Sequence, residues 1–246
     1  MKTLLASLLV AFGAGPVLAQ LPAQPQEFQS VKVIQSSPAI FPEDLIPNYR
    51  NGGHVRMEIS VGPDGKLGEW LVTAHTHQRF ADAAVAALKD LSFEPARWRG
   101  EPVPVCITLN FDFEVKGVVI SLSSSEVLAN QFNTMLYQQD AYSTCTLREL
   151  DRIPVPRKAV APVYPKELAD RGDSGAISVE FFIDEQGNVR MPYVLGRPNV
   201  ALANLAVDAV RQWTFEPPTR KGQPVLVHVR QLFQFRPASA TGAPKL

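Results

Sequence analysis

The stretch that decides the fold is GAISVEFFIDEQG, residues 175–187, because an equivalent stretch, GHVRMEISVGPDG, occurs at residues 53–65. The two stretches open a longer repeat, in which residues 53–113 align with residues 175–235 without a gap, at a constant offset of 122. Of the 61 aligned positions, 17 are identical. A repeat of this kind indicates two copies of one supersecondary unit. At 246 residues the chain has room for two such modules and their linkers.

Each copy opens with a strand pattern. Apolar residues alternate with polar or small ones, as expected for a half-buried strand. The turns at residues 62–65 and 184–187 end in glycine and predict a hairpin. In the second strand of copy two, Pro192 removes one ladder donor, so this strand should lie at an edge or carry a bulge. The apolar positions of the first strand are Val55, Met57, Ile59 and Val61 in copy one, and Ile177, Val179, Phe181 and Ile183 in copy two.

A helical period follows the hairpin in each copy. A Phe-Glu-Pro step should stop the helix, because proline disfavours helical geometry in the residue before it. A last strand follows, over residues 103–113 or 225–235. The predicted fold class is therefore α+β, with the order strand, strand, helix, strand around an antiparallel sheet. The helix faces are Phe80, Ala84, Ala87, Leu88 and Leu91, and Leu202, Leu205, Ala206, Ala209, Val210 and Trp213, with Phe215 after them.

The first 19 residues have the features of a cleavable export signal. Lys2 precedes an apolar run that ends in Val17-Leu18-Ala19, a pattern that a signal peptidase accepts. An uncleaved membrane anchor is the alternative, but Pro16 interrupts the run, which is shorter than the roughly 20 residues that span a bilayer. We expect residues 20–37 and 237–246 to be a disordered linker and tail.

The charges and cysteines set further bounds. The 24 basic and 24 acidic residues balance, which gives no reason to expect nucleic acid as a partner.

After export, Cys106 and Cys145 would meet an oxidising compartment, where a disulfide is a candidate. Two free thiols are the alternative. The alternation of residues 103–113 turns Cys106 away from the main apolar face of its strand.

The second copy resembles the C-terminal domain of the TonB family. The resemblance covers about two thirds of the chain and rests on several short motifs rather than on the order of elements. Pro165 suits the start of a short helix and Gly172 its end. The motifs are LDRIPVP at 150–156, APVYP at 161–165, the turn that ends in Gly187, WTFEP at 213–217, GQPV at 222–225 and FQF at 233–235; their signature residues are Tyr164, Pro165, Gly187, Trp213, Phe215 and Pro217.

The first copy departs from this signature. Pro47 would fall inside the entry helix and should shorten it, and Leu91 stands where the second copy has Trp213. We therefore place a divergent module at 38–115 and a fuller one at 158–236. The linker, 116–157, includes a predicted amphipathic helix that begins near Ser123 and bears Leu128, Phe132, Met135 and Leu136 on one face. This helix would bridge the modules or, alternatively, meet a partner.

Motifs typical of enzymes are missing from the sequence: there is no phosphate loop, nucleophile elbow, zinc helix or paired redox cysteine motif. We predict a non-enzymatic protein with no cofactor or metal. His75 and His77 could hold a metal, but exposed loop histidines are the preferred interpretation. Glu94 and Glu216 recur between Phe and Pro, which favours a structural turn over acid–base work. Tyr164 and Trp213 are interpreted as core rather than as a ligand platform.

The resemblance implies binding by strand addition, in which a peptide segment of an outer-membrane transporter extends the sheet of the domain. The candidate partner-binding residues are those of the last strand of copy two, Val225, Leu226, Val227, His228, Val229 and Arg230. The preferred prediction is an exported periplasmic protein that binds envelope proteins, such as TonB-dependent transporters. An energy transducer anchored in the inner membrane and a structural adaptor that binds no peptide remain alternatives.

Overall fold

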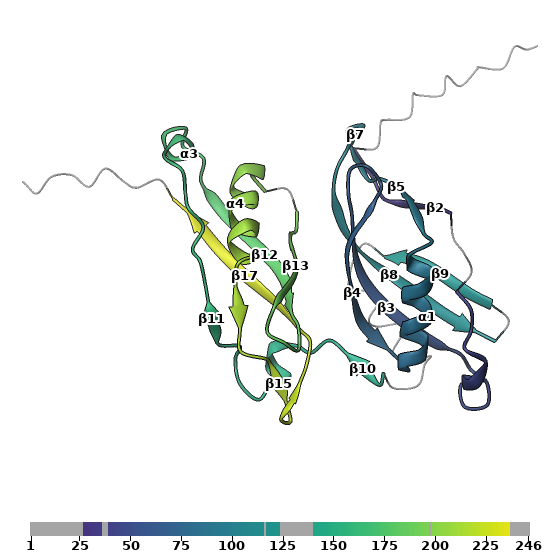
Figure 1. The fold of residues 1–246 in the computed structure, drawn as a ribbon. Helices are drawn as coiled ribbons and strands as arrows, with labels where there is room; N and C mark the ends of the chain where they lie inside the picture. Colours follow the sequence, from purple (N-terminus) through teal and green to yellow (C-terminus); the bar gives the residue numbers. More distant parts are fainter. Residues whose placement is uncertain (1–26, 36–38, 116, 124–139, 197, 237–246) are drawn as a thin grey trace, which may run out of the picture.

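The computed structural model describes residues 27–35, 39–115, 117–123, 140–196 and 198–236, which form two modules joined by one segment (Figure 1). Each module has an antiparallel sheet with one long helix across one face. The predicted α+β fold class and its tandem arrangement are confirmed. Predicted features that fall on other residues, namely the export signal, the linker helix beyond Ser123 and the tail, lie outside the described residues.

The first module is built on a five-stranded sheet in the order β10-β4-β3-β8-β9. Its four repeat elements are β3 (Gly53–Val61), β4 (Leu67–His75), α1 (Gln78–Leu88) and β8 (Val105–Glu114). Two strands outside the aligned repeat complete the sheet, β9 (Gly117–Ser123) and β10 (Tyr142–Ser143). The sequence patterns did not predict either of these two strands.

The second module has a smaller sheet, in the order β13-β12-β17. Its repeat elements are β12 (Gly175–Ile183), β13 (Val189–Val194), α4 (Val200–Val210) and β17 (Val227–Phe235). A register shift opposite β13 and its place at the rim of the sheet agree with what Pro192 predicts. The helix ends at Val210, before Trp213, because residues 214–215 pair as a short strand.

Burial follows the predicted alternation. The odd-numbered residues of β3 and β12 face the helix, and Met57, Ile59, Val179 and Phe181 are fully buried there. Aromatic side chains fill the remaining space beneath the helices, where Phe80 lies against Phe113 in the first module and Phe181 against Phe215 in the second. The two cores are separate, and each lies between one sheet and one helix.

Short elements close the ends of the modules. The entry helix is a 3-10 turn, η1, in the first module and a short α-helix, α3, in the second, as Pro47 predicts. The short helical elements are η1 (Glu43–Leu45), η2 (Leu147–Glu149) and α3 (Lys166–Asp170). The short paired strands of the first module are β1 (Phe28–Gln29) with β6 (Arg97–Trp98) and β7 (Glu101–Pro102), and β2 (Lys32–Gln35) with β5 (Ser92–Glu94). Those of the second module are β11 (Pro156–Lys158) with β14 (Thr214–Phe215), and β15 (Thr219–Arg220) with β16 (Gln223–Pro224).

The prediction of a disordered linker over residues 20–37 is wrong for its second half. β1 pairs with β6 and β2 pairs with β5, so this segment is part of the first module. Val31 between them is 3% exposed and belongs to the core of that module. Val33 also packs against this core, and β1 and β2 are too short for their apolar residues to give a clear strand pattern in the sequence.

The two modules contact each other through the sheet faces that α1 and α4 do not cover. Phe182, Met191 and Leu226 of the second module form a buried cluster with Leu71 and Cys106 of the first, together with Tyr142 from the joining segment. At its border the carboxylate of Glu69 accepts hydrogen bonds from Arg190 Nε, at 2.6 Å, and from the Met191 main-chain N–H, at 3.2 Å. We call this contact the module junction.

We predict that Gly187→Ala destabilises the protein far more than Gly222→Ala. Both glycines have positive φ, which costs an alanine about 1 kcal/mol or more. A Cβ at Gly187 would also lie 2.1 Å from the Phe215 carbonyl oxygen, whereas one at Gly222 would meet nothing within 4 Å. Urea unfolding should therefore show a loss of about 3 kcal/mol for the first variant and about 1 kcal/mol for the second. Equal losses would contradict this packing.

Candidate strand-binding edge

In the first sheet, the repeat strands β8 and β4 each have a further strand beside them. β9 pairs with β8 from Thr108 to Glu114. On the opposite rim, β10 pairs with β4, and Thr144 continues this contact by donating its N–H to the Thr73 carbonyl at 2.8 Å. Neither β8 nor the end of β4 therefore offers its main chain to an added strand.

The β13 rim of the second sheet faces the module junction. The Met191 N–H is taken by Glu69 of the first module, and Met191 itself has a φ of 48°, which breaks the regular strand. Pro192 has no N–H to donate. This rim is therefore interrupted in the middle and is a poor template for another strand.

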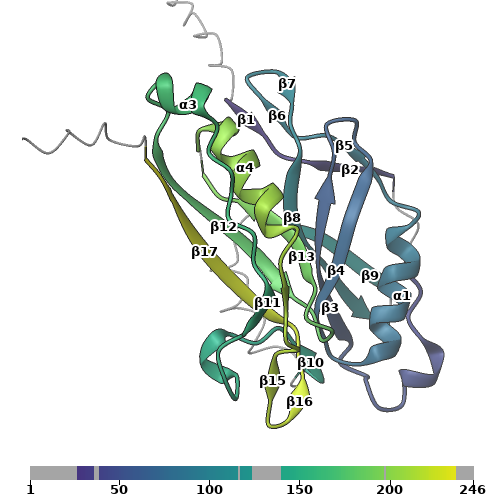
Figure 2. The ribbon, with the colours of Figure 1, turned by 60° about the vertical axis from the view of Figure 1, so that its left-hand side comes forward.

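The outer rim of β17 is different. Its inner side pairs with β12 without a break from Val227 to Phe235. Cys145 covers the beginning of the outer side: its N–H donates to the Leu226 carbonyl at 2.8 Å, and its carbonyl accepts from the His228 N–H at 3.2 Å. Figure 2 shows β17, in yellow, on the side of the second module that faces away from the first.

Alternation then identifies the open main-chain groups. Because the His228 N–H points away from β12, the amides two, four and six residues later point the same way. These belong to Arg230, Leu232 and Gln234, all of which are exposed. In the described part of the chain, no strand pairs with β17 on this side. We call Arg230–Gln234 the open edge.

The main-chain directions in β17 narrow the proposed binding site relative to the set expected from the sequence. Val225 precedes the strand, and the Leu226 carbonyl and the His228 N–H are bonded to Cys145. Val227 and Val229 direct their main-chain groups toward β12. Arg230 remains, and Leu232 and Gln234 extend the site beyond the expected range. Counting inward and outward amides could have located them only if the contact with Cys145 had been known.

Comparison of the two copies shows why the second edge is open. β9, with the sequence GVVISLS at 117–123, consists largely of β-branched and apolar residues that favour a strand. The positions at the repeat offset, 239–245, read SATGAPK, with glycine and proline in place of that pattern. The second copy therefore has no sequence equivalent of β9.

A buried charge lies beside the open edge. Glu180 of β12 is 1% exposed, and its Oε1 accepts a hydrogen bond from Nε of Arg230 at 2.9 Å and forms an ion pair with Nη2 at 2.6 Å. His228 Nε2 lies 3.0 Å from the other carboxylate oxygen. A buried carboxylate requires such partners, so Glu180 holds Arg230 across the sheet face. No pattern in the sequence marks Glu180 as the partner of Arg230.

The signature residues of the second copy are structural. Tyr164 packs edge-on against Phe235 and donates its hydroxyl to the Asp173 carbonyl. Trp213 packs against Phe181 and donates Nε1–H to the Val160 carbonyl at 2.7 Å. These contacts agree with the interpretation of both residues as core. The others are Pro165 at the N-cap of α3, Gly187 at the β12–β13 turn, buried Phe215 in β14 and Pro217 two residues after that strand.

The two cysteines are free thiols in this structure, so the predicted disulfide is not formed. Cys106 packs in the module junction, while Cys145 is buried where its main chain bonds Leu226. Burial raises the pKa of the Cys106 thiol to about 12 and also raises the pKa of Cys145. Both groups are therefore protonated at neutral pH and weakly reactive.

The prediction of exposed loop histidines is wrong for His75. It ends β4, is 7% exposed and stacks on the Tyr142 ring at 5.2 Å, while the Tyr142 hydroxyl donates to Glu185 of the second module at 2.6 Å. His77 caps α1 by accepting the Arg79 N–H at Nδ1. The described residues contain no group of three or more histidine, cysteine or carboxylate side chains that could hold a metal ion.

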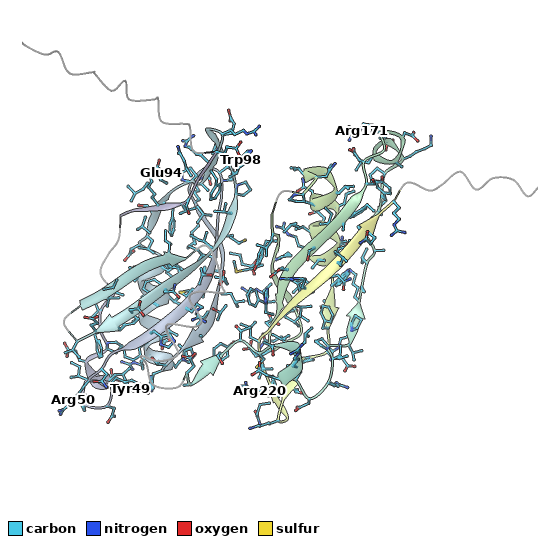
Figure 3. The ribbon with its side chains drawn as sticks, turned by 180° about the vertical axis from the view of Figure 1, so that it is seen from behind. Tyr49, Arg50, Glu94, Trp98, Arg171 and Arg220 are labelled. Carbon is cyan, nitrogen blue, oxygen red and sulfur yellow. The ribbon has the colours of Figure 1, made fainter. Side chains whose placement is uncertain are left out.

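The recurring glutamates have structural surroundings. Glu94 lies in β5 and forms a surface ion pair with Lys32 of β2 at 3.4 Å. Figure 3 shows Glu94 near Trp98 at one end of the first module, far from the open edge. Glu216 pairs with Arg152, which lies next to the turn that enters the second module. These contacts fit the structural interpretation of both residues.

Comparison with known families agrees with this geometry. The profile described as Gram-negative bacterial TonB protein C-terminal matches residues 40–115 and again residues 160–237. Together these ranges cover more than half of the chain. The chain therefore belongs to the TonB C-terminal family and contains two copies of its domain.

Individual relatives match a single copy. Protein TonB of Vibrio cholerae is 31% identical over 78 residues, which is 31% of this chain and 32% of that protein. The chain thus matches about a third of the length of this relative. The solution structure of the Pseudomonas aeruginosa TonB C-terminal domain is 28% identical, covering 37% of this chain and 92% of that one, with a TM-score of 0.32.

We predict that acidification weakens the fold partly through His75. Burial lowers the pKa of His75 below its ordinary value of 6.5, so the unfolded chain takes up the proton first as the pH falls. The stability that neutral His75 provides is complete above pH 6.5 and is lost as the pH falls below it.

Urea unfolding between pH 8 and pH 5 should therefore show a smaller loss of stability for His75→Phe, which can stack without titrating, than for the unaltered protein. His77→Asn, which retains a capping side chain, is the control and should keep the original slope. An identical pH slope in all three proteins would contradict the role given to His75.

Proposed function

We propose that this chain is an exported periplasmic protein that binds a short peptide segment of an envelope protein, such as a TonB-dependent outer-membrane transporter, and catalyses no reaction. The segment is added as a strand to β17 along the open edge. Membership of the TonB C-terminal family supports a partner of this type. In the described residues no helix is long and apolar enough to cross a membrane.

The observation that carries the proposal is the row of outward main-chain groups at Arg230, Leu232 and Gln234. An unpaired rim of this kind binds extended peptides through backbone hydrogen bonds, while side chains at alternate positions give selectivity. Of the equivalent repeat strands, β8 is paired on both sides and β13 is interrupted at the module junction. We assign binding to β17 as the repeat strand with an open outer side, although β9 also lies at a rim of its sheet.

A structural adaptor is the second candidate, and the module junction favours it. The buried cluster around Phe182, Met191 and Leu226 holds the modules against each other without a ligand. An adaptor that uses only this contact would have no need of the open edge. The two candidates therefore differ in whether peptide binds to β17.

We predict that Leu232→Pro abolishes binding of transporter plug peptides. Proline removes an outward N–H that a ligand strand requires, but it leaves the inner pairing with β12 in place. Leu232→Val is the matched control, because it keeps the N–H and a strand-forming side chain. Calorimetric titration of the full chain should show binding for the control and a loss of at least tenfold for the proline variant.

Unfolding curves of both variants would show whether the fold survives. Equal affinity of the two variants would rule out strand addition at this edge. Absence of binding to the unaltered protein as well would favour the adaptor.

We also predict that the mature protein begins at Gln20 and is recovered in the soluble periplasmic fraction, since a signal peptidase accepts the residues before it. N-terminal sequencing after osmotic shock would measure this. Recovery in the inner membrane with Lys2 intact would instead support the anchored energy transducer.

A further inference from the structure

Arg230 occupies a position at which the two copies differ in chemistry. Glu58 of β3 and Glu180 of β12 are equivalent in the repeat, and both are buried. In the first module, Thr108 donates its hydroxyl to Glu58 at 2.7 Å. In the second module, the equivalent residue is Arg230, which bonds Glu180. The equivalent glutamates therefore have different donors: the short, neutral Thr108 in the first module and the long, cationic Arg230 in the second.

The exchange coincides with the difference between a covered and an open edge. Thr108 is 7% exposed, and its main chain pairs with Ser123 of β9. The Arg230 side chain is 68% exposed, and in the described part of the chain no residue takes the place of Ser123. A ligand strand on β17 would place one of its own residues at that position, directly opposite Arg230.

The guanidinium group of Arg230 is positioned to meet such a residue. Nε donates to Glu180 Oε1 and Nη2 lies 2.6 Å from the same oxygen, so both contacts hold the group across the sheet. A guanidinium has five N–H donors in a rigid fork, so Glu180 leaves Nη1 directed to further acceptors. A Glu or Asp side chain opposite Arg230 would supply them, whereas a Lys would place two like charges side by side.

We propose that Arg230, held by Glu180, is a specificity-determining residue of the open edge and selects ligand strands that carry a carboxylate opposite it. This inference rests on the proposed function, because it requires a strand on β17. The alternative is that Arg230 merely guards the edge against self-pairing, as exposed charges on edge strands often do. A guarding charge would favour no particular peptide at low protein concentration.

The test uses the chain's own covering strand as the probe. Peptides of residues 115–123, VKGVVISLS, extended by two glycines and amidated, are made with Ser, Glu or Lys at the position of Ser123. In the structure, Ser123 of β9 pairs with Thr108 of β8, and Thr108 is the repeat equivalent of Arg230. Each peptide is titrated against the full chain and against Arg230→Thr, which supplies the donor that the first copy uses.

We expect the unaltered protein to bind the Glu peptide about three- to tenfold more tightly than the Lys peptide, with a smaller ratio at high salt. Arg230→Thr should bind all three peptides with nearly equal affinity while unfolding at a similar urea concentration. Binding of the Glu and Lys peptides with the same ratio by both proteins would overturn the proposal and leave Arg230 as a guard.

Failure of the underlying function would look different. Leu232→Pro should bind none of the peptides. If that variant binds like the unaltered protein, or if the unaltered protein binds no peptide, strand addition at β17 is wrong, and the selectivity of Arg230 is overturned with it. If Arg230→Thr still binds the peptides but no longer prefers Glu over Lys, the result supports both strand addition at β17 and the selectivity of Arg230.

Discussion

The unpaired main-chain groups at the rims of the two sheets are the constraint on which the architecture depends. A strand at a rim has N–H and C=O groups directed outward, and a protein must cover them, interrupt them or use them. In the first module β9 covers β8, and β10 covers the end of β4. In the second, Glu69 interrupts one rim at Met191, and Cys145 covers the beginning of the other. Among the repeat strands, the open edge of β17 is what remains.

This constraint explains how two copies of one domain can differ in role. Their cores are built alike, with aromatic side chains between a sheet and one helix. They differ at the strand that follows the repeat, which is apolar and β-branched after the first copy but not after the second. In the first module the last repeat strand is thus covered by the chain itself, and the sheet face that α1 does not cover contributes Leu71 and Cys106 to the module junction.

The sequence predicted the parts of the fold that local chemistry determines. The alternation of β3 and β12, the glycine turns and the shortening of the entry helix by Pro47 all follow from residue type and spacing. β9, which pairs with the adjacent strand β8, lies outside the aligned repeat from which the strands were predicted. The strands β1, β2 and β10 escaped prediction because they are short and pair with segments distant in sequence. His75 was misplaced for the same reason, since the Tyr142 ring that covers it lies 67 positions along the chain (142 − 75).

The candidate site was predicted only in part. The last strand of the second copy was expected to bind a partner, but which of its amides point outward depends on the contact between Cys145 and Leu226. Main-chain groups along a strand point alternately inward and outward, so an assignment that is wrong by one residue exchanges all inward and outward groups. Glu180 was missed because a single glutamate in an apolar strand gives no sign of the arginine beside it.

Amide hydrogen exchange of the full chain, measured by NMR with and without a transporter plug peptide, tests strand addition at the open edge. We predict that the N–H groups of Arg230, Leu232 and Gln234 exchange freely in the unbound protein and become protected when peptide binds. The amides of Val229 and Gln231, which pair with β12, should be protected in both states. Protection that appears elsewhere on the protein, with these three amides unchanged, would contradict strand addition at the open edge.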